Sequence, residues 1–291
     1  MSISGQNLSI VIVTLKSEKI IHECIKSINQ DLPIIVVENS NNETFKNDLE
    51  SKYKNLKCIL SKSNLGMGAA NNIGIKSSST DYVLILNPDV ILQNNTLDEI
   101  FLASKKISEF TILSPISSDI NYPNYGMFNK KNKIEITDSP FKVDYVDGFA
   151  MLLNKKKFKN NIFFDENFFL YLENSDICLR VNKKGESIYV IPGAKIKHRG
   201  GKTVDAKYEN EVELSRNWHW IWSKFYFNKK NFGFIKALRE CLMTYLTSIV
   251  KFIFYFIIRN NFKKKIYFNR TSGFYNALTG KSSWYRPNLN D

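Results

Sequence analysis

The first hundred residues alternate short apolar runs with longer polar stretches that have the length of helices. We interpret the apolar runs as strands over residues 8–13, 34–37, 56–60 and 82–86. Helices are expected between them, over residues 17–29, 42–53 and 68–77. Two of the runs are almost wholly apolar, as in strands that are covered on both faces. The pattern therefore predicts βαβ units, with a mostly parallel central sheet, helices on both faces and right-handed crossovers.

The pattern changes after Pro115. The expected elements are a loop or short hairpin, a strand, an aromatic run, a helix ended by Gly185, and two further strands, over residues 121–132, 143–153, 163–172, 175–184, 187–191 and 194–197. From Tyr208 onward the chain has a helical pattern. We therefore expect an α/β domain over residues 1–207 and a helical C-terminal region over residues 208–291.

Polar residues follow several of the predicted strands, at the edge where ligands bind in sheets of this kind. Thr14 follows the first strand, Glu38 the second, and Asn87 and Asp89 the fourth. The Glu38 carboxylate can accept a hydrogen bond from the imide N–H of a uracil or thymine ring, or from ribose hydroxyls. An equally good interpretation of Glu38 is a solvated acid near a helix N-cap.

Residues 64–74 combine glycines and small side chains at the start of the third predicted helix. Such residues let a backbone or a ligand come close, and the free N–H groups of a helix start attract anions. Asn64, Gly66 and Asn71 are therefore candidates for ligand contacts. The segment is not the Gly-x-Gly-x-x-Gly dinucleotide motif, and taken alone it is better explained as a turn packed tightly against a strand.

Asp89 stands at the end of a buried strand, in the segment Leu86-Asn87-Pro88-Asp89. A carboxylate in this place is well positioned to bind Mg²⁺ or Mn²⁺, which prefer one or two carboxylates together with phosphate oxygens. The alternative is a turn closed by Asn-Pro-Asp, which is the better explanation if the segment is taken alone.

Glu173 and Asp176 are three residues apart and come directly after the aromatic run. They lie on one side of a starting helix. The aromatic side chains would reduce local water and raise the pKa of one acid toward the working range of a general base. The alternative is capping of the helix N-terminus by acids.

Taken together and in this order, these segments resemble the family 2 glycosyltransferases, especially bacterial rhamnosyltransferase-like members. The resemblance runs from about residue 8 to about residue 203, and its most specific parts are residues 64–74, 86–90 and 164–180. It continues through Gly185 and through residues 190–192 and 198–201. It implies the Rossmann-like A-type nucleotide-sugar fold, with a divalent metal, Mg²⁺ or Mn²⁺, at the strand ends.

The resemblance also implies roles for individual residues. Glu38 stands where the family has an aspartate that contacts the nucleoside, and it is one methylene longer. Asp89 corresponds to the metal-binding acid of an Asp-x-Asp-like signature, and Asn87 to its first acid. His198 corresponds to a histidine that can reach the metal or the diphosphate. Gly148 corresponds to a glycine that borders the acceptor.

The sequence departs from the family at Asn174. Many members have an aspartate there, which is usually assigned as the catalytic base, whereas an amide cannot accept a proton at neutral pH. We therefore expect Glu173 to be the base, with Asp176 orienting the acceptor or capping the helix. The alternative is a weak or inactive sugar-nucleotide-binding subunit.

The net charge of +13 is concentrated in the last quarter of the chain, where fourteen Lys or Arg residues from Arg216 onward face only two acids. Residues 241–258 are strongly apolar, with polar residues in one helical stripe at 244, 247, 248, 251 and 255. Lys251, near the middle, argues against a transmembrane span. We expect an amphipathic helix that binds an anionic membrane surface through residues 240–270. Packing on the catalytic domain or in a homodimer is the alternative.

The sequence thus predicts an inverting transferase that moves a sugar from a nucleoside-diphosphate sugar, dTDP-rhamnose-like or a UDP-sugar, to a glycan or lipid-linked hydroxyl. The setting would be bacterial surface polysaccharide or glycoconjugate synthesis. Nucleic-acid binding rests on charge alone and is disfavoured, because the basic tail is mixed with a long apolar face. Four widely spaced cysteines and the polar residues 1–7, which offer no signal peptide, fit the cytoplasm, with the protein peripheral on the inner face of the cell membrane.

Overall fold

The computed structural model describes residues 2–29, 31–107, 109–119, 121–129, 134, 136–200 and 204–289. The chain divides into two compact units, one of Met1–Asp165 with Asn174–Asp205 and the other of Glu166–Glu173 with Ala206–Asp291. The short 166–173 segment thus belongs to the same unit as the C-terminal region, which the sequence did not predict.

Among the described residues, the first unit holds a nine-stranded sheet in the order β3-β2-β1-β4-β10-β6-β11-β5, with β8 paired to β11. Its strands are β1 (Leu8–Thr14), β2 (Ile34–Glu38), β3 (Leu56–Leu60), β4 (Tyr82–Leu86), β5 (Val90–Leu92), β6 (Ile112–Ser117), β8 (Phe141–Val143), β10 (Ala150–Asn154) and β11 (Ile188–His198). β1 to β4 are mutually parallel, and β10 is antiparallel to β4 and β6. The registers pair Thr14 with Glu38 and Glu38 with Leu60, so the carboxyl ends of three strands are level.

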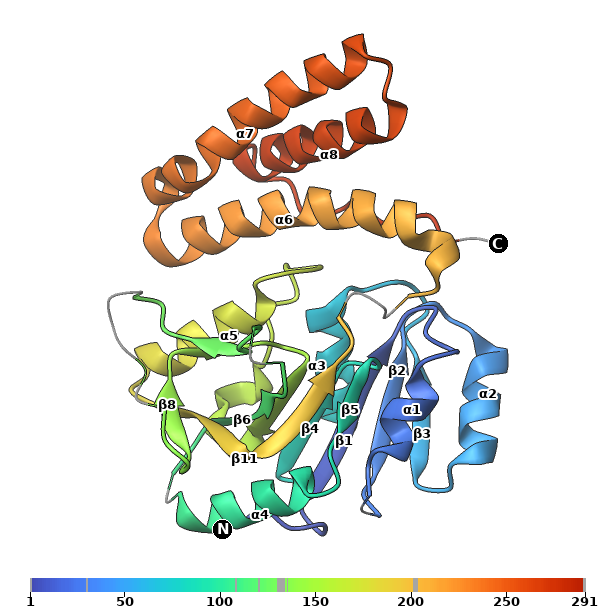
Figure 1. Ribbon diagram of the computed structural model, residues 1–291, viewed down its shortest axis with the longest axis vertical. Helices are drawn as coiled ribbons and strands as arrows, with labels where there is room; N and C mark the ends of the chain where they lie inside the picture. Colours follow the sequence, from blue (N-terminus) through green and yellow to red (C-terminus); the bar gives the residue numbers. More distant parts are fainter. Residues whose placement is uncertain are drawn as a thin grey trace. The chain divides into compact units, whose positions relative to one another are not determined.

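Helices cover both faces of this sheet (Figure 1). Ile10 and Ile12 of β1 join the core cluster formed with α1 (Ile21–Lys26), α2 (Glu43–Lys52) and α4 (Thr96–Lys106). Val11 and Val13 point the other way, into the cluster formed with α3 (Met67–Ser77) and α5 (Glu173–Lys183). The predicted A-type α/β fold, with a mostly parallel sheet between two helical layers, is confirmed.

Three predicted strands differ from the structure. The run predicted over residues 143–153 is broken into β8, β9 (Tyr145–Val146) and β10, because β9 leaves the large sheet and pairs with β7 (Tyr125–Gly126). The two strands predicted over residues 187–191 and 194–197 are one strand, β11, whose register shifts between Ile191 and Lys195. Pro192 lies within the shift, where the missing N–H of a proline breaks the hydrogen-bond ladder.

The second unit is built on three helices among its described residues, α6 (Glu209–Phe232), α7 (Phe234–Ile257) and α8 (Asn261–Leu278), as the helical pattern predicted. Gly233, with a φ of 91°, ends α6 and begins α7. At Gly273 of α8 an added Cβ would lie 2.4 Å from the Trp218 carbonyl oxygen, so α6 and α8 approach closely. The core between the helices contains Trp218, Ile221, Trp222, Phe225, Ala237, Cys241, Phe274 and Ala277.

Short 3-10 turns lie at Lys155–Lys157 and Lys159–Asn161 in the first unit and at Ala206–Tyr208 in the second.

Candidate functional site

Thr14 and Glu38 end neighbouring strands at the carboxyl edge of the sheet, and both are buried. The Glu38 carboxylate accepts hydrogen bonds from the Ser40 backbone N–H, from Ser40 Oγ at 2.6 Å and from the Asn42 backbone N–H at 2.6 Å. Both of its oxygens therefore bind the loop that leads into α2. These contacts place Glu38 beside the N-cap of α2, as the alternative interpretation expected, but the acid is buried and not solvated. Its contact with a nucleoside stays a prediction.

Asn64 and Gly66 belong to a turn that Asn39 fixes to the end of β2. Asn39 Nδ2 donates to Asn64 Oδ1 at 3.1 Å and to the Gly66 carbonyl at 3.3 Å, while Asn39 Oδ1 accepts from the Leu65 N–H at 3.0 Å. Gly66 has a φ of 83° and caps α3, a conformation that favours glycine. The turn therefore presents the first N–H groups of α3 at the carboxyl edge of the sheet.

Asn71 and Asn72 are both buried on α3 but differ in their contacts. Asn72 exchanges two hydrogen bonds with the Phe164 backbone, at 2.9 and 3.0 Å, and so ties α3 to the start of the aromatic run. Asn71 Oδ1 is buried and finds no hydrogen-bond donor in the part of the chain that the structure describes. Of the two residues, Asn71 therefore has a side-chain oxygen that can accept a hydrogen bond from a ligand.

Asp89 is fixed by its backbone while its carboxylate is left without a hydrogen bond. Asn87 donates its N–H to the Phe149 carbonyl at 2.9 Å, and Arg199 donates to the Asp89 carbonyl at 3.2 Å. The Asp89 side chain is fully buried, and neither of its oxygens has a hydrogen-bond partner among the described residues. The His198 imidazole lies beside it, with Nε2 3.5 Å from Asp89 Oδ2. A buried carboxylate without hydrogen bonds lowers the free energy of unfolding, unless a cation binds beside it.

The surroundings of Asp89 fit a hard divalent cation. Asn87 Oδ1 is also buried without a donor among the described residues, so two kinds of oxygen ligand occur in one turn. His198 stacks on Phe149 with ring centroids 4.0 Å apart, which holds its imidazole beside Asp89. No cluster of three or more His, Cys, Asp or Glu able to hold a metal occurs among the described residues. Mg²⁺ and Mn²⁺ do not need one, because they complete their coordination with phosphate oxygens and water.

Asp147 is a further acid near His198, and the sequence analysis did not select it. Burial raises the pKa of Asp147, and the neighbouring His198 ring lowers it by a smaller amount. The charge of Asp147 in turn raises the pKa of Tyr122. Its backbone N–H donates to the Asn124 carbonyl at 2.8 Å. The sequence carried one signal for this residue, namely an acid directly before Gly148 in an otherwise apolar run.

Asn174 lies beside the turn that contains Asp147. Asn174 Nδ2 donates to the Val146 carbonyl at 3.0 Å, and a Cβ added to Gly148 would lie 3.2 Å from Asn174 Cβ. Gly148 thus lets the first turn of α5 approach β9. The amide that replaces the expected aspartate is therefore used as a hydrogen-bond donor to the backbone.

Asp176 is fully buried and pairs with Arg180, whose Nε lies 3.0 Å from Asp176 Oδ2. Arg180 also donates to the carbonyls of Ile162 and Phe163. Asp176 therefore neutralises an arginine that fixes the chain before the aromatic run. Its predicted role toward the acceptor stays a prediction, since these contacts are structural.

Glu173 is the first residue of α5, and its side chain differs from that of Asp176. Its Oε2 atom is buried and has no hydrogen-bond partner among the described residues. Burial raises the pKa of Glu173 to about 7. The pKa of Glu173 therefore lies in the working range of a general base.

The predicted site residues are thus distributed over two parts of the structure. The sheet unit holds Thr14, Glu38, Asn64, Gly66, Asn71, Asn87, Asp89 and His198, on its strand ends, on the adjoining loops and, for Asn71, on α3. Gly201, at the end of the resembling segment, lies outside the described residues. Glu173 belongs to the other unit, directly before Asn174 of the sheet unit.

Comparison with known proteins gives a consistent result for the sheet unit. The profile of one protein family, described as Glycosyl transferase family 2, matches residues 9–170. The chain is 24% identical over 200 residues to the low-salt glycan biosynthesis hexosyltransferase Agl10 of Haloferax volcanii, which covers 62% of this chain and 64% of that protein. It is 26% identical over 245 residues to the rhamnosyltransferase WbbL of Escherichia coli, which covers 72% of this chain and 88% of that protein.

A solved structure shows the same fold. The mannosyltransferase PcManGT of Pyrobaculum calidifontis, in complex with GDP-Man and Mn²⁺, superposes with a TM-score of 0.55 at 12% identity. The match covers 96% of this chain and 87% of that protein. At this identity the likeness concerns the fold alone.

The raised pKa of Glu173 predicts how stability depends on pH. Since the folded protein holds a proton that an unfolded glutamate releases, stability should fall as pH rises from about 4.5 to about 7 and then level off. Glu173→Gln cannot ionise, so the unfolding free energy of the variant minus that of wild type should increase across this window. Urea unfolding at several pH values measures the difference. A difference that stays flat across this window for Glu173→Gln would contradict the assignment.

Proposed function

The chain is a glycosyltransferase of family 2, of the rhamnosyltransferase-like kind, and from this premise we propose that it is an inverting enzyme that uses a nucleoside-diphosphate sugar. The acceptor would be a hydroxyl of a glycan or of a lipid-linked sugar, in the synthesis of a bacterial surface polysaccharide or glycoconjugate. The names of two relatives, a rhamnosyltransferase and a hexosyltransferase, support a dTDP-rhamnose-like or UDP-linked hexose donor.

One observation carries this proposal, the buried Asp89 carboxylate without a hydrogen-bond partner. Asp89, together with Asn87 and His198, would hold a Mg²⁺ or Mn²⁺ ion that neutralises the diphosphate leaving group. Asn71 Oδ1 and the first N–H groups of α3 would contact the nucleotide at the same edge of the sheet. The structure with GDP-Man and Mn²⁺ has the same fold, which supports a nucleotide-sugar and a divalent metal as ligands.

Glu173 would act on the acceptor. Its carboxylate, ionised in part at neutral pH, would take the proton of the acceptor hydroxyl as that oxygen forms a bond to the anomeric carbon. The bond from the anomeric carbon to the diphosphate breaks on the opposite side, so the configuration inverts. Asn174 supports a second candidate function, a subunit that binds a sugar nucleotide without turnover, because this amide occupies the place of the usual base.

Asp89→Asn tests the donor site. The variant should lose Mn²⁺-dependent binding of UDP, dTDP or GDP, because the carboxylate that holds the bridging cation is gone. Asp81→Asn is the matched control, since Asp81 precedes β4 at its other end and pairs with Lys156. Calorimetric titration of each nucleotide with and without Mn²⁺ measures the effect. Equal affinity of the Asp89→Asn and Asp81→Asn variants would place the metal elsewhere; binding in wild type without donor turnover would favour the second function.

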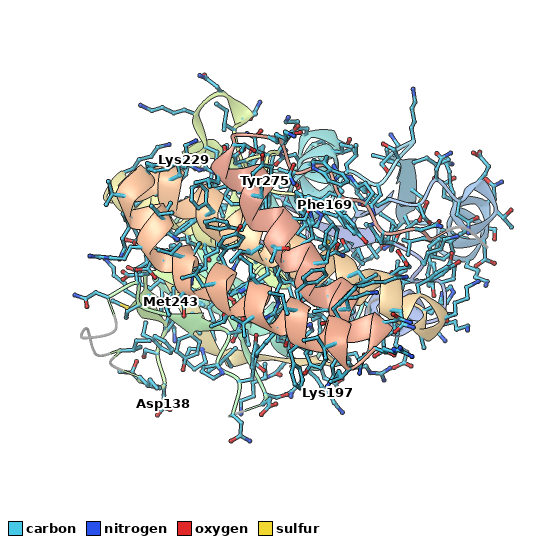
Figure 2. All side chains as sticks on the ribbon, turned by 90° about the horizontal axis from the view of Figure 1, so that it is seen from above. Asp138, Phe169, Lys197, Lys229, Met243 and Tyr275 are labelled. Atoms are coloured by element: carbon cyan, nitrogen blue, oxygen red, sulfur yellow. The ribbon has the colours of Figure 1, made fainter. Side chains whose placement is uncertain are left out.

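We also propose that α7 docks on an anionic bilayer. Among the described residues α7 is the one helix long and apolar enough to cross a membrane, and little of it is buried. The buried residues of α7 are Ala237, Cys241 and Ser248, and Tyr255 stacks on Tyr267 of α8. Its predicted polar stripe therefore faces its own unit in part. The opposite side is an exposed apolar face of Leu242, Met243, Leu246, Val250, Ile253, Phe254 and Ile257; Met243 of this face is labelled in Figure 2.

Basic residues border this apolar face and favour a lipid surface as its partner. Lys263 lies over the Tyr255 ring at 5.3 Å and Lys264 over the Phe256 ring at 5.6 Å, so the start of α8 brings its lysines to the end of α7. A lysine near an anionic surface contributes about 1 kcal/mol to binding. Because α7 packs along α6 and α8, and Lys251 near its middle lies over the Tyr267 ring of α8 at 5.3 Å, α7 would lie in the plane of the membrane. This arrangement would hold the enzyme on the inner face of the cell membrane.

Ile253→Glu tests the bilayer proposal in the full chain. The variant should lose binding to phosphatidylcholine vesicles that contain phosphatidylglycerol, because a charge enters the apolar face. Ile162→Glu is the control, since Ile162 is equally apolar and exposed but lies in the sheet unit. Co-sedimentation should also weaken with added salt and without phosphatidylglycerol. Vesicle binding that does not depend on lipid charge would contradict the proposal. It would also be contradicted if neither protein bound vesicles and wild type formed a dimer that Ile253→Glu dissociates.

A further inference from the structure

The two residues directly before Glu173 have an unusual backbone conformation. Tyr171 has a φ of 72° and Leu172 a φ of 66°, both in the left-handed region. This region is unfavourable for residues with bulky side chains, and two such residues in succession are rarer still. Such a conformation persists only where the surrounding structure holds it, and it is often found next to functional groups.

α6 provides the contacts that hold this segment. Ser223 is fully buried, and its Oγ donates to the Leu170 carbonyl at 2.7 Å, directly before the left-handed pair. The Trp220 ring packs edge-on against the Tyr171 ring, with centroids 5.5 Å apart. Phe168, two residues before Leu170, packs edge-on against Tyr226 at 4.9 Å. Trp220, Ser223 and Tyr226 therefore lie on neighbouring turns of α6, and their partners lie between residues 168 and 171 of the segment.

Phe169 is enclosed by two further residues of the same unit. One face of its ring is near His219 of α6, with centroids 4.4 Å apart, and the Arg286 guanidinium lies 3.8 Å from the ring centroid. His219 is itself fixed, since its Nε2 lies 2.8 Å from the Tyr285 carbonyl. Burial lowers the pKa of His219 to about 3, so it stays neutral at physiological pH. The residues after α8 thus complete the support that α6 begins.

Burial has a larger effect on the pKa values of Tyr171 and Glu173 than the charged side chains around them. Burial raises the pKa of Tyr171, with a lowering contribution from Arg216 and raising contributions from Glu213 and Glu173. For Glu173 itself, burial raises the pKa and a hydrogen bond from its own backbone opposes it. The environment of the Glu173 carboxylate is therefore set by where the backbone places it.

We propose that α6 is a positioning element for the Glu173 carboxylate, acting through Ser223 and Trp220 on the left-handed pair Tyr171–Leu172. This inference rests on the proposed role of Glu173 as the base. It assigns to the helical unit a part in the transfer reaction that is separate from membrane binding. Ser223 and Trp220 are positioning residues, because they act on the acceptor through Glu173.

Ser223→Ala tests the inference in the full chain. The control is Ser248→Ala, the same change at a buried serine of α7 whose hydroxyl bonds within its own helix, to the Thr244 carbonyl. The first readout is the unfolding free energy of each protein minus that of its Glu173→Gln derivative, across pH 4.5 to 7. The pH-dependent difference should shrink in the Ser223→Ala background, where water reaches the carboxylate, and stay as in wild type in the Ser248→Ala background.

The second readout is turnover. Hydrolysis of dTDP-rhamnose and UDP-glucose in the presence of Mn²⁺ should fall about 10²-fold in kcat for Ser223→Ala, with a small change in KM, because a displaced base loses its alignment. Trp220 is exposed on one side, so Trp220→Ala should fold even if Ser223→Ala does not. Trp220→Ala should reproduce both effects, and Trp220→Phe, which keeps an aromatic edge for Tyr171, should restore them.

The outcomes separate this inference from the proposed function. A pH-dependent difference equal to that of wild type in the Ser223→Ala and Trp220→Ala backgrounds would overturn the positioning role. A shrunken difference in these backgrounds, together with a wild-type protein that does not hydrolyse or bind either donor, would support the positioning of Glu173 and contradict the proposed donor. An equal loss in the Ser248→Ala background would show a general loss of packing and would also overturn the inference.

Discussion

The Asp89 carboxylate is taken out of water by the fold without receiving a hydrogen-bond donor from the described residues, and the rest of the sheet edge is built around it. Its backbone cannot retreat, because Asn87 and Arg199 hold the turn through their N–H groups. The charge is therefore a standing cost to the folded protein. A divalent cation and a diphosphate would remove this cost, so ligand binding and stability are linked through one side chain.

The helical unit contains a second energetically unfavourable feature, a strained backbone conformation before Glu173. Tyr171 and Leu172 adopt left-handed conformations, and Glu173 follows with a half-buried side chain and a pKa of about 7. Ser223 and Trp220 hold this geometry from α6. Both costs thus fall on acids that we propose for chemistry, whereas Asp176 and Glu38 are fully hydrogen-bonded within the structure.

The sequence predicted the fold class because the signals for the parallel half of the sheet are local. The apolar runs and the glycine-rich helix start give the parallel half of the sheet and the position of Asp89 after β4. Glu38 could not be resolved in the same way, since its contacts depend on the conformation of the loop at Ser40 and Asn42. Asp147 was missed because residues 143–153 look like one strand, and the break arises from pairing with Tyr125–Gly126, about twenty residues earlier.

The left-handed pair at Tyr171–Leu172 was also beyond local reasoning. An aromatic run predicts burial, and burial does raise the pKa of Glu173, but bulky residues disfavour the backbone that they adopt here. Only contacts from α6, some fifty residues later, explain that backbone. For α7 the sequence predicted one polar stripe and an apolar face, and the packing of α7 on α6 and α8 leaves that apolar face exposed.

The most direct test of the central claim is the order of thermal stability of wild type and Asp89→Asn, measured above neutral pH with and without Mn²⁺ and a nucleoside diphosphate. Without ligands, Asp89→Asn should melt at a higher temperature than wild type, because the variant removes a buried charge. With both ligands, wild type should be stabilised and the order should reverse, because the variant cannot hold the cation. A variant that is less stable than wild type without ligands, or an order that ligands do not change, would contradict the account.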